Sequence, residues 1–291
     1  MRCETTADPA AFWELAAGFL LGDPVVNSVL LTNVAARRAG TTTDPAPATY
    51  AAVLDGAKTV VGAAMRTPPF GIVLSSMPDA AVAPLAGAME ASCPDAVGVS
   101  GPGALAEAFS VAWAARTGAG VALEHRTRLH RLDAVTPPPA LPGLWRLAGP
   151  ADRDLLVDWT GAFELETGLG VSGTAAMDVE SRLAGDRAFL WIDGGPVSYV
   201  ATSGPSGGVV RVGPVYTPPE RRARGYATAL VAAVSQRALD GGAATCSLFT
   251  DAANPTANRI YATVGYRWIG DFAVFGFGAP AVREGGGTRP G

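Results

Sequence analysis

A proline-rich segment, "VTPPPALPG" from Val135 to Gly143, is the feature that most limits how this chain can fold. Four of its nine residues are proline. Proline fixes φ and has no backbone N–H, so such a segment belongs neither in a helix interior nor in a central strand, and it favours an extended connector. The chain has 291 residues, enough for two domains of about 100 to 200 residues each. We therefore expect domains at 1–136 and 144–280, joined by a linker at 137–143.

Both halves alternate between short apolar runs and longer runs of helical periodicity, which is typical of α/β folds with a mixed sheet and helices on both faces. Asp8 and Pro9 form a helix-start signal at the beginning of the first of these helical runs. We expect a glycine-rich disordered tail at 281–291. The expected helices are 8–21, 78–91, 103–118, 152–166, 175–185, 225–240 and 254–265. The expected strands are 50–56, 59–65, 71–76, 121–132, 144–149, 188–194, 196–203, 209–217, 245–251 and 266–277.

Charge and composition exclude several classes of protein. The net charge is −4, which argues against a nucleic-acid partner because such binding depends on excess lysine and arginine. Cys3, Cys93 and Cys246 are isolated, which argues against a disulfide framework or a zinc site and fits a reducing compartment. His125 and His130 lie five residues apart on an expected strand and should point to opposite faces. We therefore expect no metal.

The N-terminal stretch resembles neither a signal peptide nor a membrane span. Acidic residues precede its apolar part, and Asp23, Pro24 and Asn27 interrupt it. We expect a cytoplasmic protein without a membrane partner.

The stretch "VYTPPERRARGYATALVAAV", from Val215 to Val234, predicts an anion-binding loop between a strand and a helix. The first turn of a helix presents backbone N–H groups that have no partner within the helix, and the helix dipole makes this end partly positive. Gly225 allows positive φ or a close approach of a ligand, and Arg222 and Arg224 add positive charge. These features together predict a phosphate cradle.

Arg222-Ala223-Arg224-Gly225-Tyr226-Ala227 resembles the acetyl-CoA pyrophosphate loop, (Q/R)xxGx(G/A), of the GCN5-related N-acetyltransferases, the GNAT superfamily, and in particular its FR47-like branch. A second block, "CSLFTDAANPTANRIYATVGYRWIGDF", resembles the following strand and helix of that family. The resemblance is strong over 209–277 and fair from residue 144 onward. The first half shows only general similarity, and its lack of a comparable loop suggests a degenerate GNAT-like domain.

This resemblance implies an acetyl-CoA-dependent N-acetyltransferase with acetyl-CoA as cosubstrate. It implies direct attack by a primary amine of a small molecule or peptide in a ternary complex. It also implies that the strand carrying "VGPVYT" splays from its neighbour to admit coenzyme A. The cofactor-binding residues that it implies are Val215, Tyr216, Thr217, Arg222, Ala223, Arg224, Gly225, Tyr226, Ala227 and Asn254.

The resemblance places Tyr261 as the general acid that protonates the departing thiolate. A phenol has a pKa near 10 and is therefore protonated at neutral pH. A buried core tyrosine is the alternative reading. Asn254 would hold the pantetheine arm, cap the following helix, or do both.

The general base and the acceptor pocket are less well defined. The strand "VVRVGPVYT" has no carboxylate, which leaves Glu164, Glu166 and Asp271 as candidate bases or as solvated surface charges. Water could instead carry the proton from an amine that is already partly neutral. Candidate walls of the acceptor pocket, which core packing would explain equally well, are Trp159, Phe163, Trp191 and Tyr199.

The main alternative is a non-catalytic acyl-CoA-binding or sensing module, in which the cradle is retained and the chemistry is lost. Tyr261 distinguishes the two hypotheses, because a binding module does not require it. A nucleotide site is disfavoured because neither GxxxxGK(S/T) nor GxGxxG occurs in the 215–234 stretch. Whether the protein is a monomer or a homodimer is left open by the sequence.

Overall fold

The computed structural model describes residues 1–41, 46–167 and 173–280. The tail predicted at 281–291 lies outside the described residues. Within the described chain, twelve strands form one continuous mixed sheet with the order β1-β2-β3-β4-β5-β12-β6-β11-β10-β9-β8-β7. None of the described helices is long and apolar enough to cross a membrane.

The first half of the chain contributes six strands and four helices to the described structure. The strands are β1 (Arg2–Thr6), β2 (Thr49–Leu54), β3 (Val60–Arg66), β4 (Ile72–Leu74), β5 (Gly98–Pro102) and β6 (Ala119–Leu132). The helices are α1 (Pro9–Gly22), α2 (Ser28–Arg38), α3 (Val82–Ser92) and α4 (Gly103–Thr117).

The second half contributes the same numbers of strands and helices. The strands are β7 (Leu144–Leu147), β8 (Ala188–Ile192), β9 (Pro196–Thr202), β10 (Val209–Tyr216), β11 (Thr245–Asp251) and β12 (Arg267–Pro280). The helices are α5 (Arg153–Thr167), α6 (Ala175–Ala184), α7 (Tyr226–Asp240) and α8 (Pro255–Val264).

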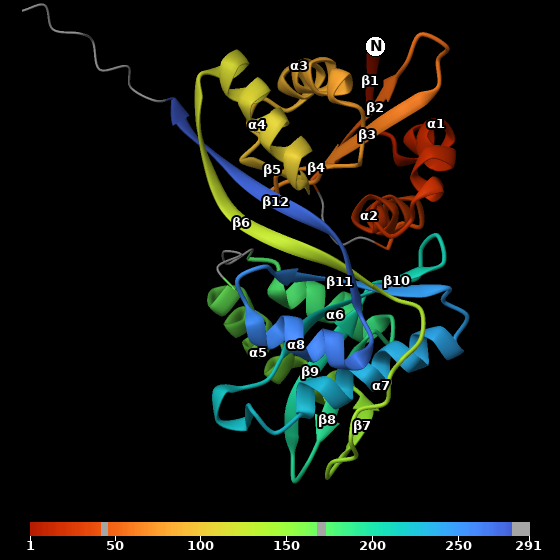
Figure 1. Ribbon diagram of the computed structural model, residues 1–291, viewed down its shortest axis with the longest axis vertical. Helices are drawn as coiled ribbons and strands as arrows, with labels where there is room; N and C mark the ends of the chain where they lie inside the picture. Colours follow the sequence, from red (N-terminus) through yellow and green to blue (C-terminus); the bar gives the residue numbers. More distant parts are fainter. Residues whose placement is uncertain (42–45, 168–172, 281–291) are drawn as a thin grey trace, which may run out of the picture.

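The two halves exchange strands. β12, the last strand of the second half, lies between β5 and β6 of the first half and is antiparallel to both. β6, the last strand of the first half, lies between β12 and β11. Figure 1 shows β6 and β12 running side by side from one half into the other. Each half thus completes its sheet with a strand from the other.

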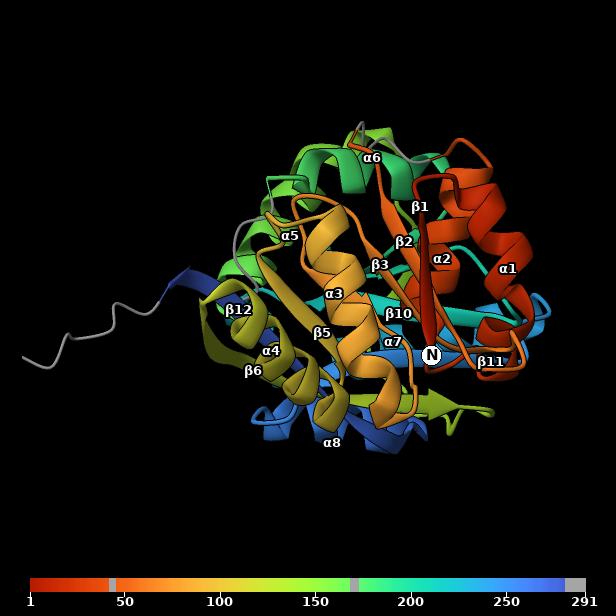
Figure 2. The ribbon, with the colours of Figure 1, turned by 90° about the horizontal axis from the view of Figure 1, so that it is seen from above.

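Helices cover both faces of the sheet in each half, as the α/β prediction requires. α1 and α2 pack on β2 and β3 from one side, and α3 and α4 enclose a separate apolar core on the other side (Figure 2). In the second half α5 and α6 cover one face of β8 to β10, and α7 and α8 cover the opposite face.

All the helices and strands expected from periodicity are present, with small shifts at their ends. β1, α2 and β5 were not predicted. α2 carries Thr32 and Asn33 at its centre, two poor helix formers whose side chains bond to the Ser28 and Val29 carbonyls one turn earlier. β5 is a five-residue strand that contains two glycines and a proline.

The predicted linker at 137–143 lies in an irregular segment between β6 and β7. The division into domains at 1–136 and 144–280 stays a prediction. Because the sheet is continuous and strands are exchanged, residues 267–280 of the second half pack within the first: Ala273 and Phe275 belong to the core under α3 and α4.

His130, on the shared strand β6, is expected to make stability depend on pH. Its side chain is 5% exposed, and burial lowers the pKa of the imidazole, although its hydrogen bond to the Arg128 carbonyl opposes this. The unfolded chain, with a histidine pKa near 6.5, then binds more protons than the folded chain as the pH falls below that value. The thermal midpoint should therefore fall between pH 7 and pH 5.5, and the fall should be smaller for His130→Gln. An identical pH slope in both proteins would contradict this assignment.

Candidate active site

β10 and β11 separate partway along their length. They pair in parallel at Val209–Thr245, Val210–Cys246 and Arg211–Ser247, and their described pairing ends there. Beyond this point β10 bulges between Val212 and Val215 and continues beside β9. β11 continues beside β6 as far as Asp251. The splayed strand pair that the resemblance implied is therefore present.

A cavity of about 700 Å³ occupies the gap between the splayed strands. It extends from the C-terminal end of α5, across β10, to the start of α7 and the first turns of α8. Every residue that the sequence analysis assigned to the cofactor or to catalysis lines this one cavity. These residues are Val215, Tyr216, Thr217, Arg222, Ala223, Arg224, Gly225, Tyr226, Ala227, Asn254 and Tyr261.

The loop before α7 leaves the first turn of that helix uncapped. Gly225 is the N-cap residue with φ +85°, a conformation that L side chains rarely adopt, and no side chain caps the helix. Ala223 also has a positive φ, +60°. The Ala229 amide makes the first helical bond, to the Gly225 carbonyl at 3.0 Å. The amides of residues 226–228 therefore lie in a helix turn that offers them no carbonyl partner.

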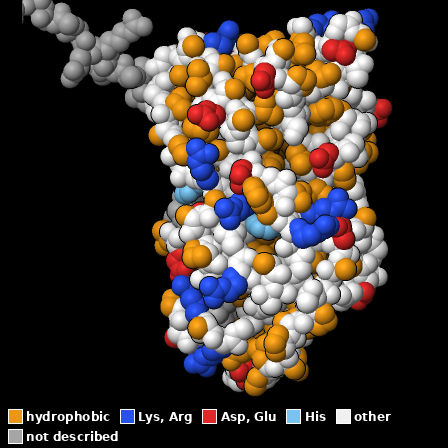
Figure 3. All heavy atoms as spheres, viewed as in Figure 1, with side chains coloured by type: hydrophobic (Ala, Val, Ile, Leu, Met, Phe, Trp, Pro, Cys, Tyr) orange, Lys and Arg blue, Asp and Glu red, His pale blue; other side chains and the backbone are white. Residues whose placement is uncertain are grey.

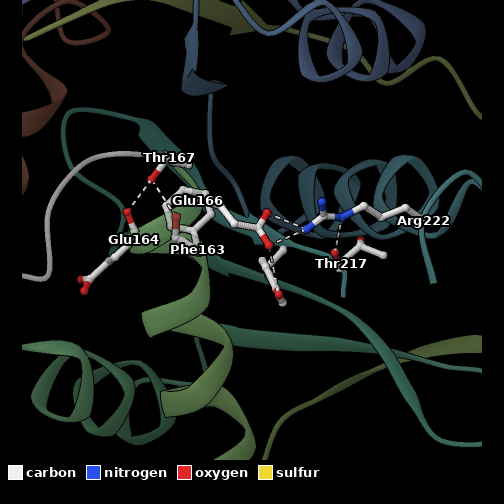
Figure 4. A network of polar contacts seen from close by, with 7 residues as sticks. Phe163, Glu164, Glu166, Thr167, Thr217 and Arg222 are labelled. Carbon is white, nitrogen blue, oxygen red and sulfur yellow. Dashed lines mark hydrogen bonds and ion pairs between the residues drawn. The ribbon is translucent and has the colours of Figure 1, made fainter. Parts of the chain in front are cut away.

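Arg222 is held across the cavity by an acidic residue of α5. One guanidinium nitrogen lies 2.8 Å and 2.6 Å from the two carboxylate oxygens of Glu166, and Nε donates to the Thr217 carbonyl at 2.8 Å (Figure 4). The Tyr216 hydroxyl lies 3.5 Å from the same carboxylate. Burial, and then the Glu166 charge, raise the pKa of the Tyr216 phenol. This pair links α5 to the loop before α7.

Of the three candidate bases, only Glu166 lines the cavity, and its carboxylate is already engaged by Arg222. Glu164 is buried and lies outside the cavity lining. Asp271 is exposed, with its nearest basic partner Arg128 at 3.9 Å. None of these three carboxylates therefore both lines the cavity and lacks an ion-pair partner, as a general base at the gap would have to.

Tyr261 lies on α8 and is 8% exposed. Its ring packs edge-to-face on Tyr266 with centroids 6.0 Å apart, and its hydroxyl makes no hydrogen bond to the described part of the chain. Burial raises the pKa of the Tyr261 phenol far above its ordinary value. The phenol therefore stays protonated at any working pH, and its O–H is available to a ligand in the cavity.

Asn254 caps α8, because its Oδ1 accepts a hydrogen bond from the Ala257 amide at 3.0 Å. One of the two alternatives for this residue is thus established, and its place in the cavity lining is compatible with the other.

The four aromatic residues proposed as acceptor walls occupy different environments. Phe163 lines the cavity, and Trp159 packs against the cavity residue Tyr216 with centroids 5.9 Å apart. Trp191 instead donates its indole N–H to the Pro142 carbonyl, and Tyr199 is fully buried in the core under α5 and α6. The last two are core residues rather than lining residues.

His125 and Asp251 line the cavity but were not predicted as site residues. His125 lies on β6, in the other half of the sequence, and reaches the site only because β6 pairs with β11. Asp251 ends β11, and its carboxylate accepts a hydrogen bond from the Ala253 amide. The odd spacing of the two histidines was the one available signal, since it assigns His125 and His130 to different faces.

Among the described residues of the first half, no equivalent gap opens at the matching position. β4 and β5 pair in parallel at Ile72–Val99 and Val73–Ser100. They remain in contact beyond this, because a Cβ built on Gly101 would lie 2.8 Å from the Leu74 Cβ. The strand pair of the first half is therefore closed where that of the second half is open.

Basic side chains are concentrated locally although the net charge is −4. In Figure 3 the larger groups of Lys and Arg side chains lie over the middle and lower part of the face that carries α7 and α8. Arg222 and Arg224 are both exposed at the cavity. An anion site at this loop is thus compatible with an acidic protein.

Comparisons with known proteins agree with this geometry. Residues 163–266 match the model of the acetyltransferase (GNAT) family. None of the curated proteins compared with the chain matches it.

Among solved structures, a Drosophila protein shares the fold with a TM-score of 0.66 at 12% identity, covering 96% of this chain and 99% of the other. A GNAT-family acetyltransferase from Colwellia psychrerythraea has a TM-score of 0.61 at 10% identity, covering 95% of this chain and 99% of the other. A tandem GNAT protein from the clavulanic acid biosynthesis pathway has a TM-score of 0.55 at 16% identity, covering 96% of this chain and 99% of the other. Residues 163–266 therefore match the GNAT acetyltransferase family, within a chain that shares its overall fold with a tandem GNAT protein.

Proposed function

We propose that this protein transfers an acetyl group from acetyl-CoA to a primary amine of a small molecule or peptide, by direct attack in a ternary complex. The observation that supports this most is the single cavity through the gap between β10 and β11. It reaches the uncapped start of α7 on one side of the sheet and the end of α5 on the other. A donor and an acceptor can therefore meet from opposite faces.

The residues around the gap fit coenzyme A. The amides of residues 226–228 and the guanidinium of Arg222 would bind the diphosphate, each charge-assisted hydrogen bond contributing about 1.5 to 3 kcal/mol. The edge of β10 that faces β11 is unpaired within the described chain beyond Arg211. Its backbone groups from Val215 to Thr217 would bind the pantetheine arm and polarise the thioester carbonyl, a contribution of about 2.7 to 4 kcal/mol for an oxyanion donor.

Tyr261 would donate its hydroxyl proton toward the departing sulfur. Its raised pKa means that a hydrogen bond, rather than complete proton transfer, is favoured while the thiolate forms. The same apolar surroundings would also raise the pKa of the departing thiol. The amine would lose its proton to water, since Glu166 is engaged by Arg222.

We infer a cytoplasmic location from the three cysteines, which are free thiols with no disulfide between them. The protein would act as a monomer or a homodimer. The N-terminal half would be a degenerate GNAT-like domain that supplies β6 and one wall of the cavity. The alternative function, acyl-CoA binding without catalysis, uses the same cradle and differs in its need for Tyr261.

Tyr261→Phe removes the hydroxyl while keeping the ring that packs on Tyr266. We expect kcat for acetyl transfer to fall by about 10²-fold, as for a lost general acid, with acetyl-CoA affinity near that of the wild type. Thiol release from acetyl-CoA over a panel of amines measures the rate, and calorimetry measures the affinity. Tyr266→Phe, which keeps the same aromatic pair, is the control. Unchanged turnover in Tyr261→Phe would remove the assigned role, and absence of turnover in the wild type would favour the binding module.

Gly225→Glu places a side chain at a residue with φ +85° and puts a negative charge beside the cradle. We expect calorimetry to detect little binding of coenzyme A, because the new carboxylate repels the diphosphate. Retained micromolar affinity would be incompatible with a diphosphate at this loop. Gly242→Glu, also at positive φ (+95°) but after the end of α7, controls for backbone strain alone.

Glu166→Gln tests whether the carboxylate competes with the diphosphate for Arg222. Both side chains of this pair are more than two-fifths exposed, so the free energy of unfolding should change by less than about 1 kcal/mol. Calorimetry should show acetyl-CoA binding strengthened by about 2- to 10-fold, because a like charge is removed from the anion site. Glu180→Gln, which breaks the exposed pair with Arg153, is the control. Weaker binding in Glu166→Gln would mean that the pair positions Arg222 for the ligand.

A further inference from the structure

A group of arginines, the α6/β10 arginine cluster (Arg182, Arg187 and Arg211), lies outside the cavity lining and is not used by the proposed mechanism. Arg211 extends from β10 across to α2, where it donates to the Thr32 hydroxyl at 3.2 Å. Arg182 extends from α6 and donates to the Tyr199 hydroxyl at 3.3 Å. Both guanidinium groups are thus partly buried between α2, α6 and the sheet, and both contact neutral oxygens.

The guanidinium group of the third member donates to a residue of the preceding helix, α6. Arg187 donates to the carbonyl and the hydroxyl of Ser181 at 2.8 Å and 2.9 Å. None of the three arginines forms an ion pair with a carboxylate in the described part of the chain. Other arginines of the same half do: Arg146 pairs with Asp152, and Arg222 with Glu166.

Without an acidic partner, the free energy lost when these guanidinium groups are desolvated is not offset by an ion pair. Burial, and then the nearby charge of Arg182, lower the pKa of the Arg211 guanidinium to about 10, and the same two causes lower the pKa of Arg187. Buried charges are normally paired, because desolvation of an isolated ion is strongly unfavourable. These three guanidinium groups therefore lack a counter-charge, which a bound anion would supply.

Two buried hydroxyl groups near the cluster also lack partners. Ser247 lies directly beside Arg211 in the parallel register of β10 and β11, is fully buried, and its Oγ has no hydrogen bond within the described chain. Ser28 lies one turn before Thr32 on the same side of α2, and its buried Oγ is likewise unsatisfied among the described residues. Buried polar groups are rarely left unpaired, so these hydroxyls are a second indication of a missing polar ligand.

The cluster lies on the acceptor side of the sheet. Tyr199, which contacts Arg182, pairs in register with the cavity residue Tyr216, and both rings pack in the core under α5 and α6. Arg211 and Val215 are four positions apart on the strand, or at most roughly 13 Å at about 3.3 Å per residue. An acceptor group that contacts Arg211 would therefore be several bonds away from the amine that reacts near Val215.

We propose that the α6/β10 arginine cluster binds an anionic group, a carboxylate or a phosphate, carried by the amine acceptor. The inference rests on the proposed function, since it assigns the acceptor class of the same site. Arg182 and Arg211 are specificity-determining residues that orient the acceptor so that its amine enters the gap between β10 and β11. The negative charge satisfies the guanidinium groups, and the acceptor is thereby selected over neutral and dicationic amines.

The test uses the full chain saturated with coenzyme A and matched amines of one length: 6-aminohexanoate, hexylamine and 1,6-diaminohexane. A fourth amine, 6-aminohexyl phosphate, separates a phosphate preference from a carboxylate preference. Calorimetry gives binding, and thiol release in the presence of acetyl-CoA gives kcat/KM. We expect one of the two anionic amines to exceed hexylamine by at least about 10-fold, as for one hydrogen bond to a charged group. Equal values for the anionic and neutral amines, or no binding of either anionic amine, would overturn the inference.

Variants separate ligand binding from a structural role. Arg182→Gln and Arg211→Met should each lower binding and kcat/KM for the preferred anionic amine by about 10- to 100-fold, with hexylamine unaffected. Arg211→Met should leave the free energy of unfolding unchanged or raise it, because an unpaired buried charge is removed. Arg153→Gln, at an arginine with carboxylate partners, is the matched control and should retain the wild-type preference. A loss of stability in Arg211→Met without loss of the anionic preference would assign Arg211 to holding α2 against β10 and overturn the proposal.

Failure of this inference is distinguishable from failure of the proposed function. Binding of acetyl-CoA without any preference for anionic amines contradicts only the acceptor class. Absence of acetyl-CoA binding contradicts the proposed function itself, and the inference with it.

Discussion

The end of the pairing between β10 and β11 is the constraint on which the site depends. Two adjacent parallel strands can separate without leaving a sheet only if each has another neighbour, because their backbone groups must remain paired. β9 holds β10 beyond the bulge, and β6 holds β11 as far as Asp251. Pro214, within the bulge, has no N–H to offer to β11. The gap therefore exposes unpaired backbone to a ligand at little cost to the fold.

This dependence gives the first half of the chain a function although its own strand pair is closed. β11 would be an edge strand on the side away from the gap if β6 did not cover it. In the same way, β12 pairs with β5 and covers its edge. The first half thus completes the sheet of the second half, and it also contributes His125 to the wall of the cavity.

The sequence predicted local features well and long-range features poorly. Periodicity predicted most helices and most strands, and the segment from Arg222 to Ala227 predicted a loop with an uncapped helix start, because each is encoded by neighbouring residues. The ion pair between Glu166 and Arg222 joins residues 56 positions apart, and no local pattern encodes it. The place of β12 in the first half and the contact between Arg211 and α2 are equally non-local. These features follow from how the two halves pack, which periodicity does not encode.

The two basic regions near the cavity differ in one respect that decides their roles. Arg222 already has a carboxylate partner, so its charge is balanced before any ligand arrives, and the proposed diphosphate would have to compete for it. Arg211 has none among the described residues, and the nearest ionisable group that perturbs it is another arginine. An anion that binds Arg222 replaces the Glu166 carboxylate as its partner. An anion that binds Arg211 instead reduces the electrostatic repulsion between Arg211 and Arg182. The second site therefore gains more from an anion of the same charge, which is why selection between acceptors is expected there and not at the phosphate loop.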